Sequence, residues 1–548
     1  MSLDPDTKQL DVAILGGGLA GLTLARQLRR ALPEASIEVF ERAEERSYKV
    51  GESTVEIASS YLTRRLGLHE YMYDQQLPKN GLRFFFDTPQ KDASLLDMSE
   101  IGTAGLPEFP SFQIDRARIE KDLIEMNRRA NVPVHLGWAV RELELATRGD
   151  GDDEGARHTF VAERGKERQK VSARWVCDAA GRASLIARKL SLRTEEGHEM
   201  AAVWARYRNV VDMDDLPMTH PDRAADADGK KYGAWRDRVR WTARYLSTNH
   251  MCYRGYWIWF IPLGRGITSV GWVGERAIFE DAMRKDEGFR RFLDGHRSSR
   301  DLMVGAELVD IGSYKQLAYG TKQFFGDRWA CVGEAAAFSD PFYSPGSDYI
   351  AIENDLVTDM IVRDFRGEPA SEQRQRREAY EELMHFRFRA TVLLYQDLYP
   401  TLGSFDALLL KWNFDIACYY NLWLDPYLRD AHLDLREIRS TLRHKDKVLE
   451  VLRVYSRMFQ RVVADLERTG RYHQNNLGKY NGAGDLMGFR AEIGRPRTQA
   501  RILDTSIRIF HAVRESAEQL CGEEIGREAR EVVASFDPRG PLAARAAF

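Results

Sequence analysis

A glycine-rich segment near the start of the chain has the residue types and spacing that suit a pyrophosphate-binding turn. An apolar run, residues 10–15, is followed at once by a G-x-G-x-x-G sequence. Glycines at its first two fixed positions permit a tight turn and let backbone amides approach a phosphate, and the third lets a helix pack closely on the strand. The helix N-terminus adds partial positive charge. The predicted cofactor-binding residues of this segment are Gly16, Gly18, Leu19, Ala20 and Gly21.

A carboxylate follows this turn at the spacing expected for contact with a ribose. The β-rich run Ile37-Glu38-Val39-Phe40 ends in Glu41, which lies twenty residues past Gly21. Its carboxylate can accept a hydrogen bond from a ribose hydroxyl. A glycine-rich turn that only packs against its neighbours is the alternative. Because strand, turn, helix and acidic residue occur in the required order, the segment predicts binding of an adenine dinucleotide.

Two later segments favour a flavin over a nicotinamide as the nucleotide. A second β-rich run ends in Asp178 and a small-residue turn, and a third leads into Gly333 and Glu334. The Glu334 carboxylate suits a ribityl or ribose hydroxyl, and the helix after it would point its positive end at the phosphates. Each segment alone could be an ordinary strand-to-helix turn. Separated by long insertions, they predict one large interrupted flavin domain. Arg116 is a further candidate for flavin contact, or alternatively a surface arginine at a helix start.

Composition excludes several other classes of protein. Among 548 residues, 80 lysines and arginines nearly balance 83 aspartates and glutamates, so no global field favours nucleic acid or an anionic membrane. Five cysteines are scattered without C-x-x-C spacing, which argues against a disulfide framework or a zinc site. We see no secretory signal and no uncharged apolar stretch long enough to span a bilayer. We therefore expect a cytoplasmic protein with no metal site and no membrane span.

A tryptophan-rich strand makes the resemblance to a known family specific. Residues 257–262, Trp-Ile-Trp-Phe-Ile-Pro, match a W-x-W-x-I-P signature at every fixed position. Over roughly residues 8–365 the chain resembles the flavin-dependent halogenases, a branch of the flavin monooxygenases. In that family the segment lies beside the flavin and keeps organic substrate away from it, a role the resemblance implies for Trp257, Trp259 and Pro262. A buried antiparallel strand rich in tryptophan is the alternative.

The resemblance also singles out Lys79 as a catalytic residue. Family halogenases carry a lysine about thirty residues after a Gly-Glu segment, followed by an apolar, a basic and an aromatic residue. Here Gly51-Glu52-Ser53 is followed by Lys79 and then by Leu82-Arg83-Phe84, and Ser53 is expected to contact the cofactor. An ammonium can hydrogen-bond hypohalous acid, or a neutral amine can carry the halogen covalently, and desolvation with a lowered pKa serves either role. A solvated lysine before a strand is the alternative.

A turn at residues 340–348 corresponds to the family's halide site. Asp340 begins it as a cofactor-binding residue, and the backbone amides of Gly346 and Ser347 are the implied halide donors. The sequence departs from the family pattern here. Pro345 removes one amide, and Asp348 adds a negative charge that disfavours chloride unless it is turned away or paired.

Two further positions depart from the family pattern, and the second of them bears on the substrate. Glu334 replaces the usual aspartate, and Tyr343 stands where tryptophan-type halogenases carry a glutamate. The second change argues against free tryptophan and favours a phenolic, pyrrolic or carrier-bound aromatic. A C-terminal run of aromatic residues is predicted to be helical core more than a substrate box; its members are Trp412, Phe414, Tyr419, Tyr420 and Trp423.

The resemblance implies a reaction and its partners. Reduced FAD from a separate flavin reductase, oxygen and chloride or bromide would yield hypohalous acid, which Lys79 would direct to an electron-rich aromatic. A flavin hydroxylase or dehydrogenase on the same scaffold is the alternative enzyme. A flavin-holding pathway partner whose halide turn has decayed is the non-catalytic alternative.

The elements that must position these residues fall into two predicted regions. Residues 1–365 should form an α/β, glutathione-reductase-type FAD-binding Rossmann domain, with an antiparallel substrate sheet inserted at about 200–300. Its parallel sheet should include segments near 10–41, 175–181 and 329–334. Residues 366–548 show helical periodicity and should form a helical C-terminal region packed over it. The acidic segment 149–155 is predicted to be a solvated hairpin tip rather than a metal site.

Overall fold

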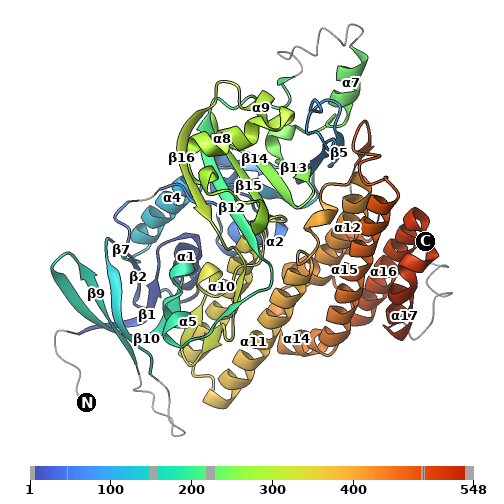
Figure 1. Cartoon of the computed structure of the whole chain (residues 1–548). Coiled ribbons are helices and arrows are strands. Elements are labelled where there is room, and N and C mark those ends of the chain that lie inside the picture. Colours follow the sequence, from blue (N-terminus) through green and yellow to red (C-terminus); the bar gives the residue numbers. More distant parts are fainter. Residues whose placement is uncertain are drawn as a thin grey trace.

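The computed structural model describes residues 7–45, 47–146, 157–216, 229–482, 486 and 488–536. The acidic segment 149–155 lies outside these residues. Two large sheets and a stack of C-terminal helices make up the described chain (Figure 1).

The first sheet is the core of the nucleotide-binding region, and its central strands are parallel. Strands run in the order β18-β19-β10-β1-β2-β7, with β8 and β9 extending the edge of β10 as an antiparallel pair. Parallel pairing joins β1 to β2 and β10, β10 to β19, and β2 to β7, which confirms the predicted parallel sheet. The strands are β1 (Lys8–Leu15), β2 (Ile37–Glu41), β7 (Val134–Leu136), β8 (Ala139–Glu144), β9 (His158–Arg164), β10 (Glu167–Asp178), β18 (Phe325–Gly326) and β19 (Trp329–Cys331).

Helices cover this parallel sheet because its central strands are apolar on both faces. Helix α1 (Leu19–Ala31) packs against α4 (Arg116–Arg129) and against α10 (Gly346–Phe365). Leu22, Ala25 and Leu28 recur along α1 at helical spacing and are fully buried. The sheet thus sits in a closed core, and its carboxyl edge is left for the glycine-rich turn.

The second sheet is mostly antiparallel and draws strands from three parts of the chain. Its order is β16-β12-β15-β14-β13-β4-β5-β20, with parallel pairing only at β13–β4 and β5–β20. It is wider than the predicted insertion at about 200–300, because β4, β5 and the C-terminal β20 also join it. The strands are β4 (Leu82–Phe86), β5 (Ser99–Ile101), β12 (Met200–Arg208), β13 (Thr248–Tyr253), β14 (Tyr256–Gly264), β15 (Ile267–Glu275), β16 (Glu307–Tyr314) and β20 (Tyr480–Asn481).

Side-chain alternation along β14 separates two cores. Tyr256, Ile258 and Phe260 enter one cluster together with Phe289 of α8 (Asp286–Asp294) and Leu302 of α9 (Arg297–Leu302). The odd-numbered residues of β14 point to the opposite face and pack with the C-terminal helices. Figure 1 shows α8 and α9 on one side of this sheet, while the C-terminal helices stand beside the other.

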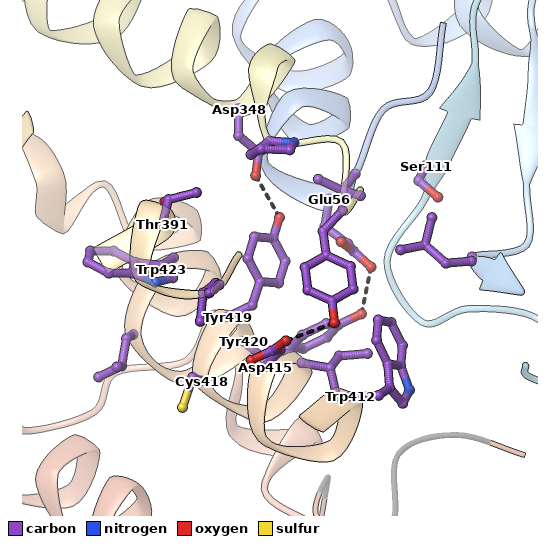
Figure 2. A pocket seen from close by; sticks show the side chains of 18 of the residues that line it. Glu56, Ser111, Asp348, Thr391, Trp412, Asp415, Cys418, Tyr419, Tyr420 and Trp423 are labelled. Atoms are coloured by element: carbon purple, nitrogen blue, oxygen red, sulfur yellow. Dashed lines mark hydrogen bonds between the residues drawn. The ribbon is translucent and has the colours of Figure 1, made fainter. Parts of the chain in front are cut away.

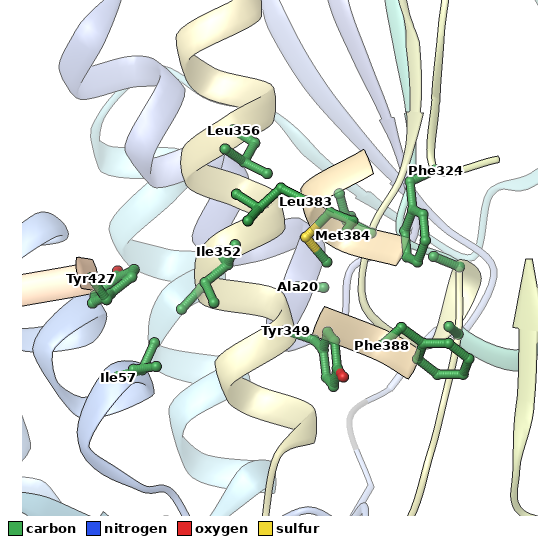
Figure 3. Close-up of a cluster of buried hydrophobic side chains, with 14 of the residues drawn as sticks. Ala20, Ile57, Phe324, Tyr349, Ile352, Leu356, Leu383, Met384, Phe388 and Tyr427 are labelled. Carbon is green, nitrogen blue, oxygen red and sulfur yellow. The ribbon is translucent and has the colours of Figure 1, made fainter. Parts of the chain in front are cut away.

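The C-terminal region is helical, as predicted. A short connection, residues 366–369, separates α10 from the next helix, and the predicted boundary falls there. One continuous hydrophobic core nevertheless crosses it: Ala20 of α1, Ile352 of α10 and Met384 of α11 belong to the same cluster (Figure 3). The further helices are α11 (Ala370–Leu393), α12 (Phe405–Cys418), α13 (Asp425–Leu428), α14 (Leu435–Leu442), α15 (Lys445–Arg468), α16 (Gln499–Cys521) and α17 (Arg527–Phe536).

Within the described residues, no helix has the length and apolar character needed to cross a membrane. All five cysteines are free, and four of them are buried. The same part of the chain contains no group of three or more histidine, cysteine or acidic side chains that could hold a metal ion.

Candidate functional site

The glycine-rich turn is built so tightly that side chains are excluded from it. Gly16 has a φ of +113°, and a Cβ there would overlap the backbone carbonyl of Ala179 on the neighbouring strand. A Cβ on Gly21 would overlap the carbonyl oxygen of Gly16. Helix α1 then begins at Leu19 with Gly18 as its N-cap and no side chain capping it. The bare backbone amides and the positive helix end suit a pyrophosphate.

Glu41 lies beside this turn at the end of β2. One carboxylate oxygen accepts the backbone N–H of Gly17 at 2.7 Å, and the other accepts that of Ala43 at 2.8 Å. The carboxylate therefore braces the turn while standing where a ribose hydroxyl would reach it, which suits its predicted role.

A cavity continues from the turn toward the second sheet, and we call it the cofactor cavity. It is lined by segments far apart in the sequence, including most of the residues predicted for the cofactor, the halide and the shield. Glu334 faces it, and burial raises the pKa of its carboxyl group. The predicted residues among its lining are Leu19, Ser53, Arg116, Trp257, Trp259, Gly333, Glu334, Gly346 and Ser347.

Besides Lys79, Glu41 and the glycine-rich turn other than Leu19, three further predicted site residues do not line this cavity. The Asp178 carboxylate accepts the backbone N–H groups of Ala180 and Ile186, at 3.0 and 2.8 Å, and so shapes the turn after β10. Asp340 is fully buried and accepts hydrogen bonds from Tyr399 and the backbone of Phe342. The third residue is Pro262 on β14. Because side chains alternate along a strand, Pro262 belongs to the face opposite the two tryptophans.

The two tryptophans of β14 form a fixed wall of the cofactor cavity. Trp257 Nε1 donates to the Tyr399 hydroxyl at 3.1 Å, and Trp259 Nε1 donates to Ser269 Oγ at 3.1 Å. Both side chains are almost completely buried. Gly271, opposite Trp259 on β15, leaves the space that the indole ring occupies. The hydrogen bonds and this close approach hold the rings in one orientation.

Gly271→Ala is expected to destabilise the protein by about 1–3 kcal/mol, because a Cβ there would overlap the Trp259 indole and force it off its position. FAD affinity should fall as well, since the displaced ring would enter the cofactor cavity. Urea unfolding and FAD titration measure the two effects. Gly233→Ala is the matched control, because a Cβ there meets no atom within 4 Å. Equal unfolding free energies for wild type and Gly271→Ala would contradict the role of this contact.

The first turn of α10, which contains the predicted halide-binding residues, faces the cofactor cavity. Gly346 and Ser347 begin this 20-residue helix, and no side chain caps it. Both line the cavity, and the buried Ser347 Oγ has no hydrogen-bond partner among the described residues. Uncapped amides at a helix N-terminus suit a halide or a phosphate. Pro345 removes an amide at the N-cap, one position before these donors.

Asp348 does not oppose these predicted halide-binding residues. It points into a different cavity, where its carboxylate accepts the Ala58 backbone N–H at 2.9 Å and the Tyr419 hydroxyl at 2.9 Å. Burial raises its pKa to about 7. The negative charge that the sequence placed next to the halide amides is thus turned away, and it is paired.

His250 is a member of the cofactor cavity that the sequence did not indicate. Its Nδ1 lies 3.0 Å from the carbonyl oxygen of Arg83, and its ring lies between Phe84 and Trp257, with centroids 5.0 and 4.9 Å away. Burial lowers its pKa to about 3, so the imidazole is neutral. A single histidine in an apolar strand carries no sequence signal for such a position.

Lys79 ends the short strand β3 (Leu77–Lys79), which pairs with β6 (Ser111–Gln113). The side chain is 1% exposed, and its Nζ donates to Ser53 Oγ at 2.8 Å and to the Thr54 carbonyl at 2.7 Å. Burial lowers its pKa from 10.5 to about 7, although Glu56 and Asp348 partly oppose this. Ser53 faces the cofactor cavity, whereas Lys79 faces a second one. The lysine therefore stands in the wall between two cavities.

This second cavity, which we call the aromatic cavity, lies between Lys79 and the C-terminal helices (Figure 2). The C-terminal aromatic run belongs to the hydrophobic cores or packs against them, as predicted, but four of its members also line this cavity: Trp412, Tyr419, Tyr420 and Trp423. Phe414 instead stacks on Tyr455 at 4.8 Å inside the helical bundle. Residues two apart on a helix face different directions, so one run serves both places.

Three tyrosine hydroxyls in the aromatic cavity donate to carboxylates. Tyr343 donates to Asp415 at 2.7 Å, which places the residue that the sequence marked as substrate-related on the cavity wall. In the same way Tyr420 donates to Glu56 at 2.7 Å, and Figure 2 draws this bond beside the one from Tyr419 to Asp348. A cavity with aromatic walls and oriented hydrogen-bonding groups suits a flat aromatic ligand.

Known flavoproteins match the chain over much of its length. Residues 9–241 match the family model described as FAD binding domain. The flavin-dependent halogenase chlA of Dictyostelium discoideum is 28% identical over 459 residues, which cover 77% of this chain and 71% of that protein. A 1H-pyrrole-2-carbonyl-(peptidyl-carrier protein) chlorinase of Pseudomonas fluorescens is 25% identical over 357 residues, or 61% of this chain and 72% of that protein.

Solved structures agree on the fold. The crystal structure of the halogenase PltM superposes with a TM-score of 0.63 at 17% identity and covers 95% of this chain and 98% of its own. The glycine-rich turn and the match over residues 9–241 show that the chain carries an FAD-binding domain, and the curated relatives to which it is similar are named as a flavin-dependent halogenase and a chlorinase.

Proposed function

We propose that the protein halogenates an electron-rich aromatic and that Lys79 delivers the halogen. The observation that carries this is the position of Lys79, whose buried side chain faces the aromatic cavity and hydrogen-bonds Ser53 on the cofactor cavity. A halogenating species formed in the cofactor cavity would have to pass this wall to reach an aromatic substrate. The tryptophan wall would keep the substrate itself out of the cofactor cavity.

The residues present fit FAD, and each side chain has a defined task. When bound and reduced, FAD would supply the activation of oxygen that turns halide into hypohalous acid. Glu41 and the Gly16–Gly21 turn would bind the nucleotide, and the first turn of α10 would hold the halide. Lys79 uses two N–H groups on Ser53 and Thr54, so its ammonium has a third N–H for the hypohalous oxygen. Transfer of the halogen to a ring carbon, with loss of the ring proton, would release water.

A separate flavin reductase is the proposed source of reduced FAD, because the sequence contains one dinucleotide-binding turn and no second one. The proposed substrate is a phenolic, pyrrolic or carrier-tethered aromatic. The similarity to a chlorinase of a carrier-bound pyrrole supports this range. We propose a cytoplasmic location, which the five free cysteines support.

Product analysis tests the proposal. Purified protein, FAD, an NADH-dependent flavin reductase, and chloride or bromide are incubated in air with phenol and pyrrole probes, and products are identified by mass spectrometry. We expect halogenated products that require both the reductase and the halide. Oxygenated products formed without halide would instead identify a hydroxylase. Failure of protein-bound, photoreduced FAD to react with oxygen at an enzyme-like rate would favour the non-catalytic alternative.

The rate of halogenation should depend on pH through Lys79. Its pKa of about 7 means that the ammonium form dominates below that pH and is lost above it. If the ammonium is the active form, the turnover number should be level below pH 7 and fall about tenfold per pH unit well above it. Turnover at saturating aromatic and halide measures this. A rate that rises through pH 7 would instead indicate the neutral amine as halogen carrier.

A further inference from the structure

Trp257, one of the two residues of the tryptophan wall, has a hydrogen bond that ring packing cannot replace. Its indole packs edge to face with Phe342, with centroids 5.2 Å apart, and lies 4.9 Å from the His250 ring. Such packing fixes the plane of the ring but not which edge faces the cofactor cavity, because the χ2 torsion of tryptophan is roughly two-fold. The bond from Nε1 to the Tyr399 hydroxyl distinguishes the two edges. Tyr399 does not line the cofactor cavity, so this bond directs the N–H edge away from it.

The Tyr399 hydroxyl can accept this bond because its own hydrogen is directed elsewhere. An indole N–H only donates, so the hydroxyl oxygen must accept from it, and the hydroxyl hydrogen needs a different acceptor. That acceptor is Asp340, whose Oδ2 atom receives the hydroxyl at 2.8 Å. Burial and the nearby Asp340 charge raise the pKa of the Tyr399 hydroxyl, which therefore keeps its hydrogen.

Asp340 is fully buried, and its carboxyl group is surrounded by possible donors. Its Oδ1 atom accepts the Phe342 backbone N–H at 2.9 Å, and His198 Nε2 lies 2.7 Å from Oδ2. An ionised carboxylate only accepts, which suits these neighbours. His198 precedes β12, Asp340 precedes α10, and Tyr399 begins a short helical turn, Tyr399–Thr401, that follows α11. The chain of bonds from Trp257 through Tyr399 to Asp340 therefore exists only in the assembled fold.

Trp259, the other residue of the wall, is held by a separate chain of bonds. Its Nε1 donates to Ser269 Oγ at 3.1 Å, and Ser269 Oγ in turn donates to Glu52 Oε2 at 2.9 Å. The two chains share no residue, although the two indole rings have centroids only 5.5 Å apart. A change confined to one chain can therefore be recognised, because the other tryptophan reports whether the wall as a whole is intact.

We propose that Asp340 is a positioning residue of the tryptophan wall and that, through the Tyr399 hydroxyl, it determines which edge of Trp257 faces the cofactor cavity. This role replaces the direct cofactor contact that the sequence predicted for Asp340. The proposal rests on the proposed function for the purpose of the wall, which is to keep organic substrate out of the cofactor cavity. The orientation of the ring itself can be tested without that function.

NMR of the indole N–H groups provides this test. The FAD-loaded protein is labelled with ¹⁵N in the indole rings of its 11 tryptophans, and Trp257→Phe and Trp259→Phe assign the two wall resonances. Tyr399→Phe removes the acceptor of the Trp257 N–H with little change in volume. We expect the Trp257 resonance to move upfield and its exchange with deuterium to become about tenfold faster. The exchange rate of the Trp259 N–H should stay unchanged.

Asp340→Asn tests whether the carboxylate acts through the hydroxyl. If the amide oxygen accepts the Phe342 N–H, the NH₂ group faces Tyr399, and the hydroxyl hydrogen loses its acceptor. Exchange at Trp257 should again become faster. Added to Tyr399→Phe, Asp340→Asn should change this rate no further, as expected when one residue acts through the other. Tyr399→Phe is the milder substitution, and it can overturn the proposal even if Asp340→Asn does not fold.

Tyr207→Phe is the matched control. Tyr207 is fully buried on β12 of the same sheet, and its hydroxyl donates to Asp286 at 2.8 Å, but it belongs to the core on the opposite face. This substitution should leave the exchange of both wall tryptophans unchanged. Ser269→Ala should show the reverse pattern to Tyr399→Phe, with faster exchange at Trp259 and an unchanged rate at Trp257.

Three results would overturn the proposal. These are an unchanged Trp257 exchange rate in Tyr399→Phe, additive effects of Tyr399→Phe and Asp340→Asn, and an equal effect of Tyr207→Phe on Trp257. Since the NMR experiment requires neither halide, reductase nor aromatic substrate, its outcome is independent of whether halogenation occurs. Failure of the proposed function, which product analysis measures, is therefore distinguishable from failure of this assignment.

Discussion

Lys79→Met is expected to lower the halogenation rate by about 10²–10³-fold while FAD still binds. Methionine keeps the length of the buried side chain but cannot donate a hydrogen bond, so the hypohalous acid would lose the ammonium group proposed to position it. Consumption of reduced FAD and oxygen should continue. Hypohalous acid should then escape into solution, where monochlorodimedone, a chemical trap for it, detects the release. Product yield and trap bleaching, measured on the same samples, should change in opposite directions.

The stability of this variant provides an independent check. Lys79 has a folded-state pKa of about 7, below its ordinary value of 10.5, so the unfolded chain binds more protons between these values. The free energy of unfolding of wild type should therefore rise as pH increases from 7 to about 10.5. Lys79→Met should lack this part of the rise. Lys121→Met, on the exposed side of α4, should match wild type in product yield and pH dependence. Full activity of Lys79→Met would contradict the proposed function.

Glu100→Gln is expected to destabilise the protein by about 3–5 kcal/mol, because it would leave Arg83 buried without its carboxylate partner and Arg244 with Asp214 alone. Glu100 is fully buried and lies 2.6 Å from Arg83 and 2.9 Å from Arg244, both of which are also fully buried. Arg83 is the basic residue of the Lys79 sequence pattern. This ion pair therefore links β4, which follows Lys79 in the chain, to the neighbouring strand β5 of the second sheet. Urea unfolding at pH 7 measures the effect.

The same cluster predicts the response to acid. The two arginines hold the pKa of Glu100 at about 2, against an ordinary value of 4.5. Its contribution to stability is complete above pH 4.5 to 5 and should be lost as pH falls toward 2. Glu100→Gln should therefore show a shallower loss of stability in this window. Glu287→Gln is the control, because the Glu287–Arg291 pair is exposed and should contribute less than about 1 kcal/mol. Similar unfolding free energies for the two variants would contradict a large contribution of the buried Glu100 carboxylate to stability.

Features that depend on residues close together in the sequence could be predicted from the sequence alone. The Gly16–Gly21 turn requires residues without side chains at fixed positions, and those positions are visible as glycines. The parallel strands β1 and β19 and the C-terminal end of β10 are short apolar runs that lead into turns, and the helices after residue 366 show their periodicity. The alternation along β14 likewise assigns Trp257 and Trp259 to one face. Applied strictly, the same alternation would have placed Pro262 on the other face.

Features that depend on the direction of a side chain in the assembled fold could not be predicted. Asp348 directly follows the halide amides in sequence, but successive residues on a helix point about 100° apart, and this one turns into the other cavity. For the same reason Trp412 faces the aromatic cavity, whereas Phe414 packs against Tyr455. Asp178 ends β10 as a cofactor-binding carboxylate would, yet it accepts backbone N–H groups of the turn that follows it, and Asp340 accepts the hydroxyl of the distant Tyr399.

The sequence by itself determined that this chain has a flavin-type nucleotide fold and a lysine in the family position. Only the tertiary structure decided that Lys79 is buried between two cavities. Its burial comes from the pairing of β3 with β6 and from acceptors on Ser53 and Thr54, which lie about 25 residues away along the chain. The aromatic cavity arises where helices from the C-terminal third meet that strand. Such contacts depend on packing between distant segments, and local sequence periodicity carries no record of them.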